Sequence, residues 1–583
     1  MRASGLVKGG LGIVASLGLW AALGFGIEGV GIDGERGVAA QTEVTKEAVL
    51  VQGSSLEVAV GAVTRVGSEI SHRLAIIDAV ATRVTPSQRE QLALRGDLRI
   101  FADAGVELMA NQVGQDTWVD TPSTVHPDQV GATTLHQQGI DGDGVTVAVL
   151  DTGLWRLYPG LAWNGWWQPR ILASYDAIRN RPGMAWDRNG HGTHVTSIIA
   201  NSDAPGGQYN GIAPNVDLVT VKAFDRDGAG TYSDVIRGLD WILDHHEELD
   251  IQVLNLSFSA QPQSFYWEDP LNQAVMRLWD EGIVVVTSAG NTGPTPMSIG
   301  VPGNIPYLIT VGAFSDAQTP QDSTDDFLTS FSATGPTLEG FVKPEIVAPG
   351  GRITAVMKWN HQIAKERPEY RESFSYFTMS GTSQAAAVTT GVVALMLEAD
   401  PGLDPDTVKC RLMASARSAI DPDTEGLAYG PLQQGAGLID AVAAVDAEIT
   451  GCANVGLDLE AELADEIHYA GPVRWDTGSE SFYVEKSGEA VYLWDGTRTE
   501  EGALWVGGSP WIDGSPWIDG SPWIDGSPWI DGSPWIDGSP WIDGSPWIDG
   551  SPWIDGLPWE IDPKVWSDGL AEPMAINQWV DQE

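Results

Sequence analysis

Cysteine and basic residues are both scarce in this chain, and each scarcity excludes a class of protein. Only Cys410 and Cys452 occur among the 583 residues, which excludes a small scaffold held together by many disulfides. The two cysteines either form one bridge or stay as separate thiols. A bridge would close a loop of about 42 residues and stabilise the fold by about 4 kcal/mol in the chain-entropy model.

Basic residues number 32 against 79 acidic ones, so the formal net charge is −47. A chain with this charge is repelled by phosphate backbones, and nucleic acid is therefore excluded as a partner. Lysine is especially scarce. An acidic, lysine-poor surface either serves solubility alone or suits a salty medium.

Long apolar runs are also scarce, and the one candidate for a membrane-directed segment runs from Leu11 to Ile27. It follows the charged residues Arg2 and Lys8, an arrangement typical of a secretion signal. We predict that residues 1–40 are a signal peptide ending near Ala40, or an uncleaved anchor, because about 17 apolar residues are at the lower limit for spanning a bilayer. Either interpretation predicts a secreted or cell-surface protein.

The chain is too long for one typical domain. Residues 41–125 have the pattern of a small α/β unit. The apolar run Leu74–Ala81 predicts a buried strand, and Pro86–Leu94 predicts a short helix with Thr85 as its N-cap. Two further short strands are expected at 98–101 and 106–108.

Residues 126–447 alternate short Val/Ile/Leu runs with helical stretches. This pattern predicts an α/β fold with a mostly parallel sheet and helices on both faces. The strands with the clearest signals are 145–150, 216–221, 251–256 and 283–286. Ligands of such sheets bind beyond the carboxyl ends of the strands, so residues that follow these strands are the candidates for chemistry.

Four segments of this region carry residues suited to acyl transfer. Asp151-Thr-Gly follows the first strand, His191 lies in Asn-Gly-His-Gly-Thr-His, and Ser383 lies in Ser-Gly-Thr-Ser-Gln-Ala. A serine hydroxyl attacks an amide only when a neighbouring base takes its proton, and a carboxylate that accepts the other imidazole N–H orients that base. Asn291, after the fourth strand, supplies a side-chain amide suited to an oxyanion.

The acid, base and nucleophile occur in the order Asp, His, Ser, which is the subtilisin order. On these segments the chain from about 129 to 447 resembles the subtilisin-like serine endopeptidases, the subtilase family. The resemblance implies hydrolysis of protein or peptide substrates through an acyl-enzyme, with Asp151, His191, Ser383 and Asn291 as catalytic residues. It also implies that residues 41–125 are a propeptide acting as folding template and intramolecular inhibitor; an unrelated N-terminal domain is the alternative.

The resemblance also implies a substrate cleft. Two segments match the edges between which the family holds an extended peptide, and one glycine falls near the floor of its specificity pocket: Gly228, Gly230 and Tyr232; Ser257, Phe258 and Ser259; and Gly300. Gly300 would leave room for a large apolar side chain. Ser259 and Ala260 stand where the family usually has glycines, which alters the shape expected for the cleft.

No cofactor is needed for this chemistry. A structural calcium ion is compatible with the family resemblance, but residues 201–210, where many relatives carry a calcium loop, match that pattern poorly. Calcium therefore stays unassigned.

After residue 447 the composition changes, because residues 448–583 hold 27 acidic and 4 basic residues. We expect an acidic linker at 448–508, eight identical Ser-Pro-Trp-Ile-Asp-Gly repeats at 509–556 and a C-terminal tail at 557–583. The repeats are either a flexible tail or stacked turns that display tryptophans. The second interpretation predicts binding to cell envelope or to other copies, and with it an alternative function as a surface or matrix-binding protein.

Overall fold

The structure is a computed structural model of the chain, and it describes residues 46–108, 111–112, 121–320, 325–420, 427–476, 478–479, 481–486 and 489–494. The predicted signal segment 1–40, the repeats at 509–556 and the tail at 557–583 lie outside these residues. The predictions made for them stay predictions. No helix in the described ranges is long and apolar enough to cross a bilayer.

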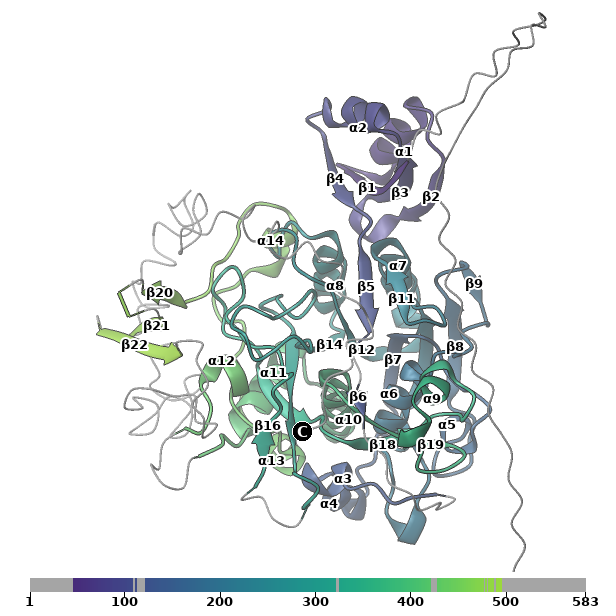
Figure 1. Cartoon of the computed structure of the whole chain (residues 1–583), viewed down its shortest axis with the longest axis vertical. Helices are drawn as coiled ribbons and strands as arrows, with labels where there is room; N and C mark the ends of the chain where they lie inside the picture. The colour runs from purple at the N-terminus through teal and green to yellow at the C-terminus, as the bar shows by residue number, and fades with distance from the viewer. Residues whose placement is uncertain are drawn as a thin grey trace, which may run out of the picture. The chain divides into compact units, whose positions relative to one another are not determined.

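The first described unit has the order βαββαβ, drawn in purple in Figure 1. Its strands form an antiparallel sheet in the order β2-β3-β1-β4. Side chains from the sheet and both helices, such as Val51, Val63 and Leu92, form a small buried core. The bounds of its elements are β1 Glu47–Gly53, α1 Leu56–Arg65, β2 Ile70–Leu74, β3 Ala79–Val84, α2 Pro86–Ala93 and β4 Leu98–Ala102.

The helix predicted after Thr85 is confirmed, and its start is a capping box. The Gln88 backbone N–H donates to Thr85 Oγ1, and the Thr85 N–H donates to the Gln88 side chain. The strand predicted over Leu74–Ala81 is wrong, because Leu74 ends β2 and Ala79 begins β3. Between them a single helical turn ends at Asp78, whose left-handed backbone (φ 53°) reverses the chain.

The main sheet has the order β16-β15-β14-β12-β7-β10-β8-β9, with β17 paired to β15. Only the short edge strands β9 and β16 are antiparallel within this sheet, so the predicted mostly parallel sheet is confirmed. The four strands expected from the sequence appear within two residues of their predicted ends. The bounds are β7 Thr146–Asp151, β8 Ile171–Asp176, β9 Arg181–Pro182, β10 Asp217–Lys222, β12 Ile251–Leu256, β14 Val284–Ser288, β15 Ile309–Ser315, β16 Phe327–Leu328 and β17 Ile346–Pro349.

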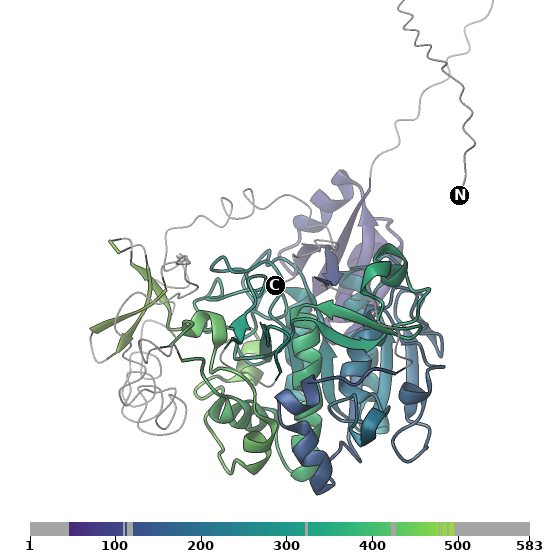
Figure 2. The same cartoon turned by 60° about the horizontal axis from the view of Figure 1, so that its bottom comes forward.

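Helices cover both faces of this sheet. Successive residues of β7 point to opposite faces: Leu150 lies under Gly238 of α7, whereas Asp151 lies under Gly192 of α6. The long helix α10 packs against α6, and α8 packs against α7. Figures 1 and 2 show these helices, in blue-green to green, layered on the strands. The bounds are α6 His191–Ala200, α7 Tyr232–Leu249, α8 Pro270–Asp280 and α10 Thr382–Ala399.

The remaining elements are short, apart from α11, or belong to small sheets. They are α3 His126–Gln129, α4 Ala132–Gln138, α5 Pro159–Ala162, α9 Gln362–Glu366, α11 Pro405–Ser415, α12 Pro431–Gln434, α13 Ala441–Asp446 and α14 Leu459–Leu463; β5 Gly105–Leu108, β6 Asn111–Gln112, β11 Ala229–Thr231, β13 Phe258–Ser259, β18 Ile353–Val356, β19 Tyr376–Ser380, β20 Arg474–Asp476, β21 Ser481–Lys486 and β22 Glu489–Trp494.

The chain continues to pack against this core after residue 447, where the sequence suggests that a linker begins. Cys410 of α11 and Cys452 form a disulfide. Glu462 of α14 is buried and accepts hydrogen bonds from the hydroxyls of Tyr266 and Tyr307. The apolar core extends to Val473, Phe482 and Val484. The boundary at 447 stays a prediction, but the packing argues against an independent linker between 448 and about 486.

Candidate active site

Asp151 and His191 are in contact and almost fully buried. The His191 Nδ1 atom lies 2.9 Å from both carboxylate oxygens of Asp151, and each residue is 1% exposed. The Thr152 N–H also donates to Asp151 Oδ1 at 2.7 Å. A carboxylate held in this way accepts the Nδ1–H and fixes the tautomer in which Nε2 is the basic nitrogen.

Local sequence explains why these two residues meet. Asp151 is the last residue of β7, and His191 is the first residue of α6. A Cβ atom on Gly192 would lie 2.4 Å from the Gly153 carbonyl oxygen and 3.0 Å from Asp151 Oδ1. Only glycine therefore lets the start of α6 approach the turn after β7 so closely.

Ser383 lies in the first turn of α10, which packs against α6. Its Oγ atom donates to the Ser257 carbonyl oxygen at 3.0 Å, and the Ser257 hydroxyl donates back to the Ser383 carbonyl oxygen at 3.0 Å. The N-terminal position directs backbone N–H groups and the positive end of the helix dipole towards the serine. That field favours negative charge next to Ser383.

The amide of Asn291 is oriented by Thr382, the residue before the candidate nucleophile. Asn291 Oδ1 accepts hydrogen bonds from the Thr382 backbone N–H at 3.0 Å and from the Thr382 hydroxyl at 2.8 Å. The oxygen of the amide is thus turned towards the start of α10, and Nδ2 is the end that can donate elsewhere. This is the orientation that an oxyanion donor requires.

A three-stranded sheet lies beside these residues, with β5 as its central strand. β5 pairs antiparallel with β11 on one side, where Gly230 faces Val106, and with β13 on the other, where Ser259 faces Glu107. Two residues after β5, the short strand β6 pairs with β19, where Asn111 faces Ser380. An extended segment of the predicted propeptide therefore occupies both predicted cleft edges.

The predicted substrate-binding residues differ in the contacts that they make near β5. Gly228 has a left-handed backbone (φ 80°) just before β11, and Phe258 is buried against Phe224. The Tyr232 backbone N–H donates to the Ala104 carbonyl oxygen at 3.0 Å. Its side chain, however, is buried, and its hydroxyl donates to Asp269 at 3.0 Å. Tyr232 therefore contacts the predicted propeptide through its backbone.

Ser259 changes the pocket that Gly300 was expected to leave open. A Cβ atom on Gly300 would lie 1.8 Å from Ser259 Oγ, and one on Gly290 would lie 3.4 Å from it. The Ser259 side chain, 3% exposed, therefore fills the space between these two glycines. The space for a large apolar side chain is smaller than Gly300 alone suggests.

Three polar side chains of the loop at 201–210 form hydrogen bonds with buried tyrosines. Asp203 Oδ2 accepts hydrogen bonds from the hydroxyls of Tyr158 and Tyr376, and Asn201 and Asn210 both donate to the Tyr376 hydroxyl. Among the described residues, no group of three or more His, Cys, Asp and Glu could hold a metal. Because calcium also binds backbone and amide carbonyl oxygens, a structural calcium ion stays unassigned.

Sequence reasoning missed a polar layer behind the two buried residues. Asp187, Thr152, Thr193 and Lys222 surround the contact between the turn after β7 and the start of α6. The sequence did hold a signal for Asp187, because an aspartate in Asp-Arg-Asn-Gly, just before a turn, is typical of a side chain that accepts N–H groups from its own turn. His194, by contrast, is a buried core residue, and burial lowers its pKa to about 3.

Comparison with known proteins gives the family. The model described as the subtilase family matches residues 142–437, about half of the chain. The chain belongs to the subtilase family. Among relatives of this subtilase, serine protease AprX of Bacillus subtilis (strain 168) is 41% identical over 278 residues, which are 47% of this chain and 61% of AprX. Subtilisin DY of Bacillus licheniformis is 30% identical over 294 residues, 50% of this chain and 90% of the relative.

A solved structure has the same fold as this subtilase. It is fervidolysin from Fervidobacterium pennivorans, described as a keratinolytic enzyme related to subtilisin, with a TM-score of 0.55 and 22% identity. The likeness covers 70% of this chain and 62% of that one. The chain thus spans less than two thirds of AprX and of fervidolysin.

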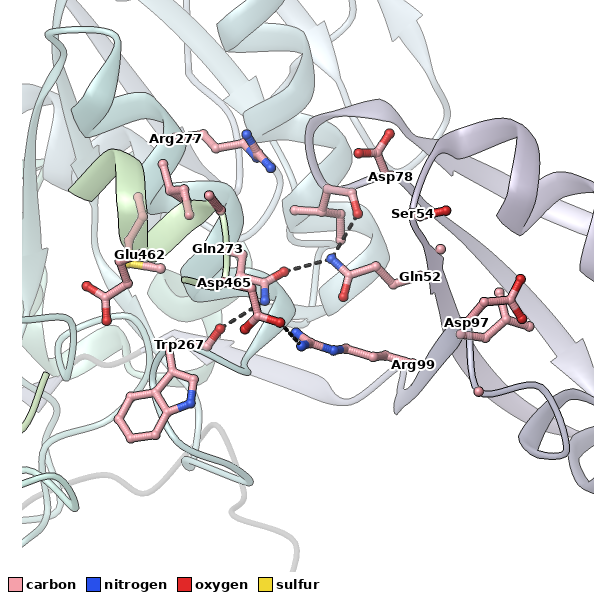
Figure 3. A pocket seen from close by; sticks show the side chains of 17 residues that line it. Gln52, Ser54, Asp78, Asp97, Arg99, Trp267, Gln273, Arg277, Glu462 and Asp465 are labelled. Carbon is pink, nitrogen blue, oxygen red and sulfur yellow. Dashed lines mark hydrogen bonds and ion pairs between the residues drawn. The ribbon is translucent and has the colours of Figure 1, made fainter. Parts of the chain in front are cut away.

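The N-terminal unit also contacts the subtilase core away from the cleft. Gln52 donates to Gln273 of α8 at 2.7 Å, and the Ile76 N–H donates to Asp240 of α7 at 2.8 Å. Arg99 forms an ion pair with Asp465, just after α14. Figure 3 shows the pocket between these elements, with Gln52 and Arg99 reaching towards Gln273 and Asp465. Its volume is about 490 Å³.

Proposed function

We propose that this subtilase is an exported serine endopeptidase, made as a precursor that its own propeptide inhibits. The single observation that carries the proposal is the buried contact of His191 Nδ1 with Asp151, beside helix α10, which carries the candidate nucleophile in its first turn. Export is supported by the signal-like N-terminus and by relatives such as the extracellular serine proteinase of Thermus sp. (strain Rt41A).

The chemistry assigns one role to each residue. Ser383 Oγ attacks the peptide carbonyl carbon while His191 Nε2 takes its proton, and Asp151 stabilises the imidazolium that results. His191 then gives this proton to the leaving amine, and an acyl ester remains on Ser383. Water repeats the sequence, so that one peptide bond and one water give an acid and an amine. No metal or organic cofactor is required in these steps.

The negative charge that develops on the carbonyl oxygen has two donors in this proposal. One is the Ser383 backbone N–H at the start of α10, and the other is Asn291 Nδ2. Both belong to a rigid, buried frame, because Thr382 holds the Asn291 amide and helix α10 holds the backbone. Donors fixed in advance stabilise the transition state without a cost of reorganisation.

The substrate is an extended polypeptide that pairs with β11 and β13, as β5 does. The three-stranded sheet supports this mode, because main-chain pairing recognises any extended peptide while side-chain pockets select among them. In the precursor the propeptide holds this position, so the site is blocked. The β5 segment pairs with β11 and β13, and the β6 segment that follows it pairs with β19, the strand that leads to Ser383. We therefore expect the maturation cleavage at one of the bonds between Leu108 and Asn111.

A covalent probe tests the proposal. The chain should react with a fluorophosphonate once the propeptide is removed, and Ser383→Ala should abolish both the labelling and the self-cleavage of the precursor. Ser418→Ala is the matched control, because Ser418 is a partly buried serine that bonds to Ala436 away from the site. Normal maturation of purified Ser383→Ala, with no other protease present, would show that the assignment is wrong.

A further inference from the structure

Asp187 is a buried carboxylate that neither the motifs nor the proposed mechanism uses. It lies in the segment between β9 and α6, four residues before His191, and is 7% exposed. A carboxylate removed from water is unfavourable unless several donors surround it. The arrangement of these donors shows what Asp187 connects.

One carboxylate oxygen joins the turn after β7 to the loop before His191. Asp187 Oδ1 accepts the Thr152 hydroxyl at 3.0 Å and the backbone N–H groups of Asn189 and Gly190, both at 2.9 Å. Thr152 directly follows Asp151, and Gly190 directly precedes His191. A single oxygen atom therefore holds the neighbours of both members of the buried pair.

The other oxygen holds the first turn of α6. Asp187 Oδ2 accepts the Thr193 backbone N–H at 3.0 Å and the Thr193 hydroxyl at 2.6 Å. The two threonines extend the network, because the Gly192 N–H donates to the Thr152 hydroxyl at 2.8 Å and the Trp155 N–H donates to the Thr193 hydroxyl at 2.9 Å. Hydrogen bonds thus hold the backbone both before and after His191.

The surroundings keep this carboxylate ionised. Burial by itself would raise the pKa of Asp187, but the nearby His361 ring, the Thr193 hydroxyl and the Lys222 ammonium outweigh it and lower the pKa below its ordinary value. The Lys222 Nζ atom also donates to the Thr152 carbonyl oxygen at 2.6 Å, so it fixes the same turn. An ionised Asp187 accepts all five hydrogen bonds at once, as a neutral side chain could not.

We propose that Asp187 is a positioning residue, which sets the orientation of His191 relative to Asp151 and Ser383. It does not touch the substrate. The inference rests on the proposed function, since it concerns the base of that reaction. Because proton transfer depends steeply on distance, a displacement of the imidazole by about 1 Å costs about 10²-fold in rate while substrate binding to β11 and β13 is unchanged.

The test replaces the anion and keeps the shape. In Asp187→Asn, one acceptor becomes an amide donor that faces the N–H and O–H donors of the loop. We expect kcat on a short peptide to fall about 10²-fold with KM within twofold of the wild type. The proton NMR signal of the His191 Nδ1–H should broaden or move upfield, because its hydrogen bond to Asp151 is no longer held in one geometry.

Asp316→Asn is the control for a general loss of stability. Asp316 is also buried and accepts the Gln318 N–H at 3.0 Å and the Gln129 side chain at 2.7 Å, but it follows β15 and contacts neither His191 nor its loop. Its variant should keep kcat whatever its melting temperature. An equal loss of kcat in both variants, or a threefold or smaller loss in Asp187→Asn, would overturn the proposal.

Thr193→Val covers the case in which Asp187→Asn does not fold. This variant keeps the side-chain volume and removes two hydrogen bonds of this network, the one from the hydroxyl to Asp187 and the one from the Trp155 N–H, so kcat should fall about tenfold with KM unchanged. An unchanged kcat would overturn the positioning role. Wild-type chain that failed to react with the fluorophosphonate would instead refute the proposed function, and the two failures are therefore distinguishable.

Discussion

Removal of the C-terminal chain at two different points should have opposite results. A chain that ends at Trp494 loses the repeats and keeps all helices and strands that the structure describes. A chain that ends at Cys452 keeps the disulfide but loses Glu462, the acceptor of two buried tyrosine hydroxyls. We expect the first chain to retain full activity on a short peptide and the second to be strongly destabilised.

The loss in free energy of unfolding can be estimated from the contacts that the chain ending at Cys452 no longer makes. With residues 453–494 in place, Tyr266 is 0% exposed and Tyr307 is 2% exposed, so the deletion removes one hydrogen bond to a carboxylate from each, at about 1–3 kcal/mol each. Loss of the buried Val473 removes about 2 kcal/mol more. A total of roughly 4–8 kcal/mol is comparable with the whole net stability of a typical domain, about 5–15 kcal/mol.

Thermal unfolding and peptide hydrolysis of both truncated chains measure the difference in stability and activity between them. Glu462→Gln in the full chain tests the same hydrogen bonds by a single substitution. That substitution should cost about 1–2 kcal/mol, because the amide keeps one acceptor for one tyrosine. If the chain that ends at Cys452 unfolds within about 2 °C of the longer one and is equally active, residues 453–494 contribute nothing to the core, and the reasoning fails.

Three further predictions address catalysis, specificity and pH. Asn291→Ala should lower kcat about 10²–10³-fold with little change in KM, which is the size of this effect in subtilisin itself. A raised KM with unchanged kcat would mean that Asn291 binds the substrate in its ground state. Ser259→Gly should open the space beside Gly300 and raise kcat/KM for peptides with a large apolar side chain before the cleaved bond, measured against the same peptides with alanine there. Burial raises the pKa of Asp240 to about 6 in the precursor. If the carboxylate regains its ordinary, lower pKa once the propeptide leaves, the bound state takes up a proton more readily than the free state. The affinity for the propeptide should then be constant well above pH 6 and increase as pH falls through 6, and Asp240→Asn should flatten this pH profile of inhibition.

The elements that local chemistry determines could be predicted from the sequence. Thr85 and Gln88 cap α2 through bonds three residues apart, and the four main strands follow from apolar runs of the right length. Asp151 and His191 were assigned because the reaction needs an acid and a base, and their motifs occur together in one order. The contact between them then needs only β7 and α6 to meet at one edge of the sheet.

What could not be predicted depends on partners that are distant in the sequence. Glu462 lies in a strongly acidic stretch, where a carboxylate is expected to face water. It is buried because Tyr266 and Tyr307, 196 and 155 residues earlier, bring their hydroxyls to it. The run from Leu74 to Ala81 is apolar except for Asp78, and the left-handed backbone of that residue shows that the run is two strands joined by a turn.

Under the proposed function, the contacts outside the cleft would explain how one extended strand inhibits while another is hydrolysed. Any peptide can make the main-chain bonds that β5 makes with β11 and β13, so those bonds do not distinguish propeptide from substrate. The propeptide also reaches Gln273 and Asp240 from its folded unit, and its Asp103 accepts the Ser233 N–H at 2.9 Å. A cleaved substrate has none of these bonds, so the proposal predicts that it leaves. A cleaved propeptide would keep them, and we therefore expect it to stay bound until its own fold is lost.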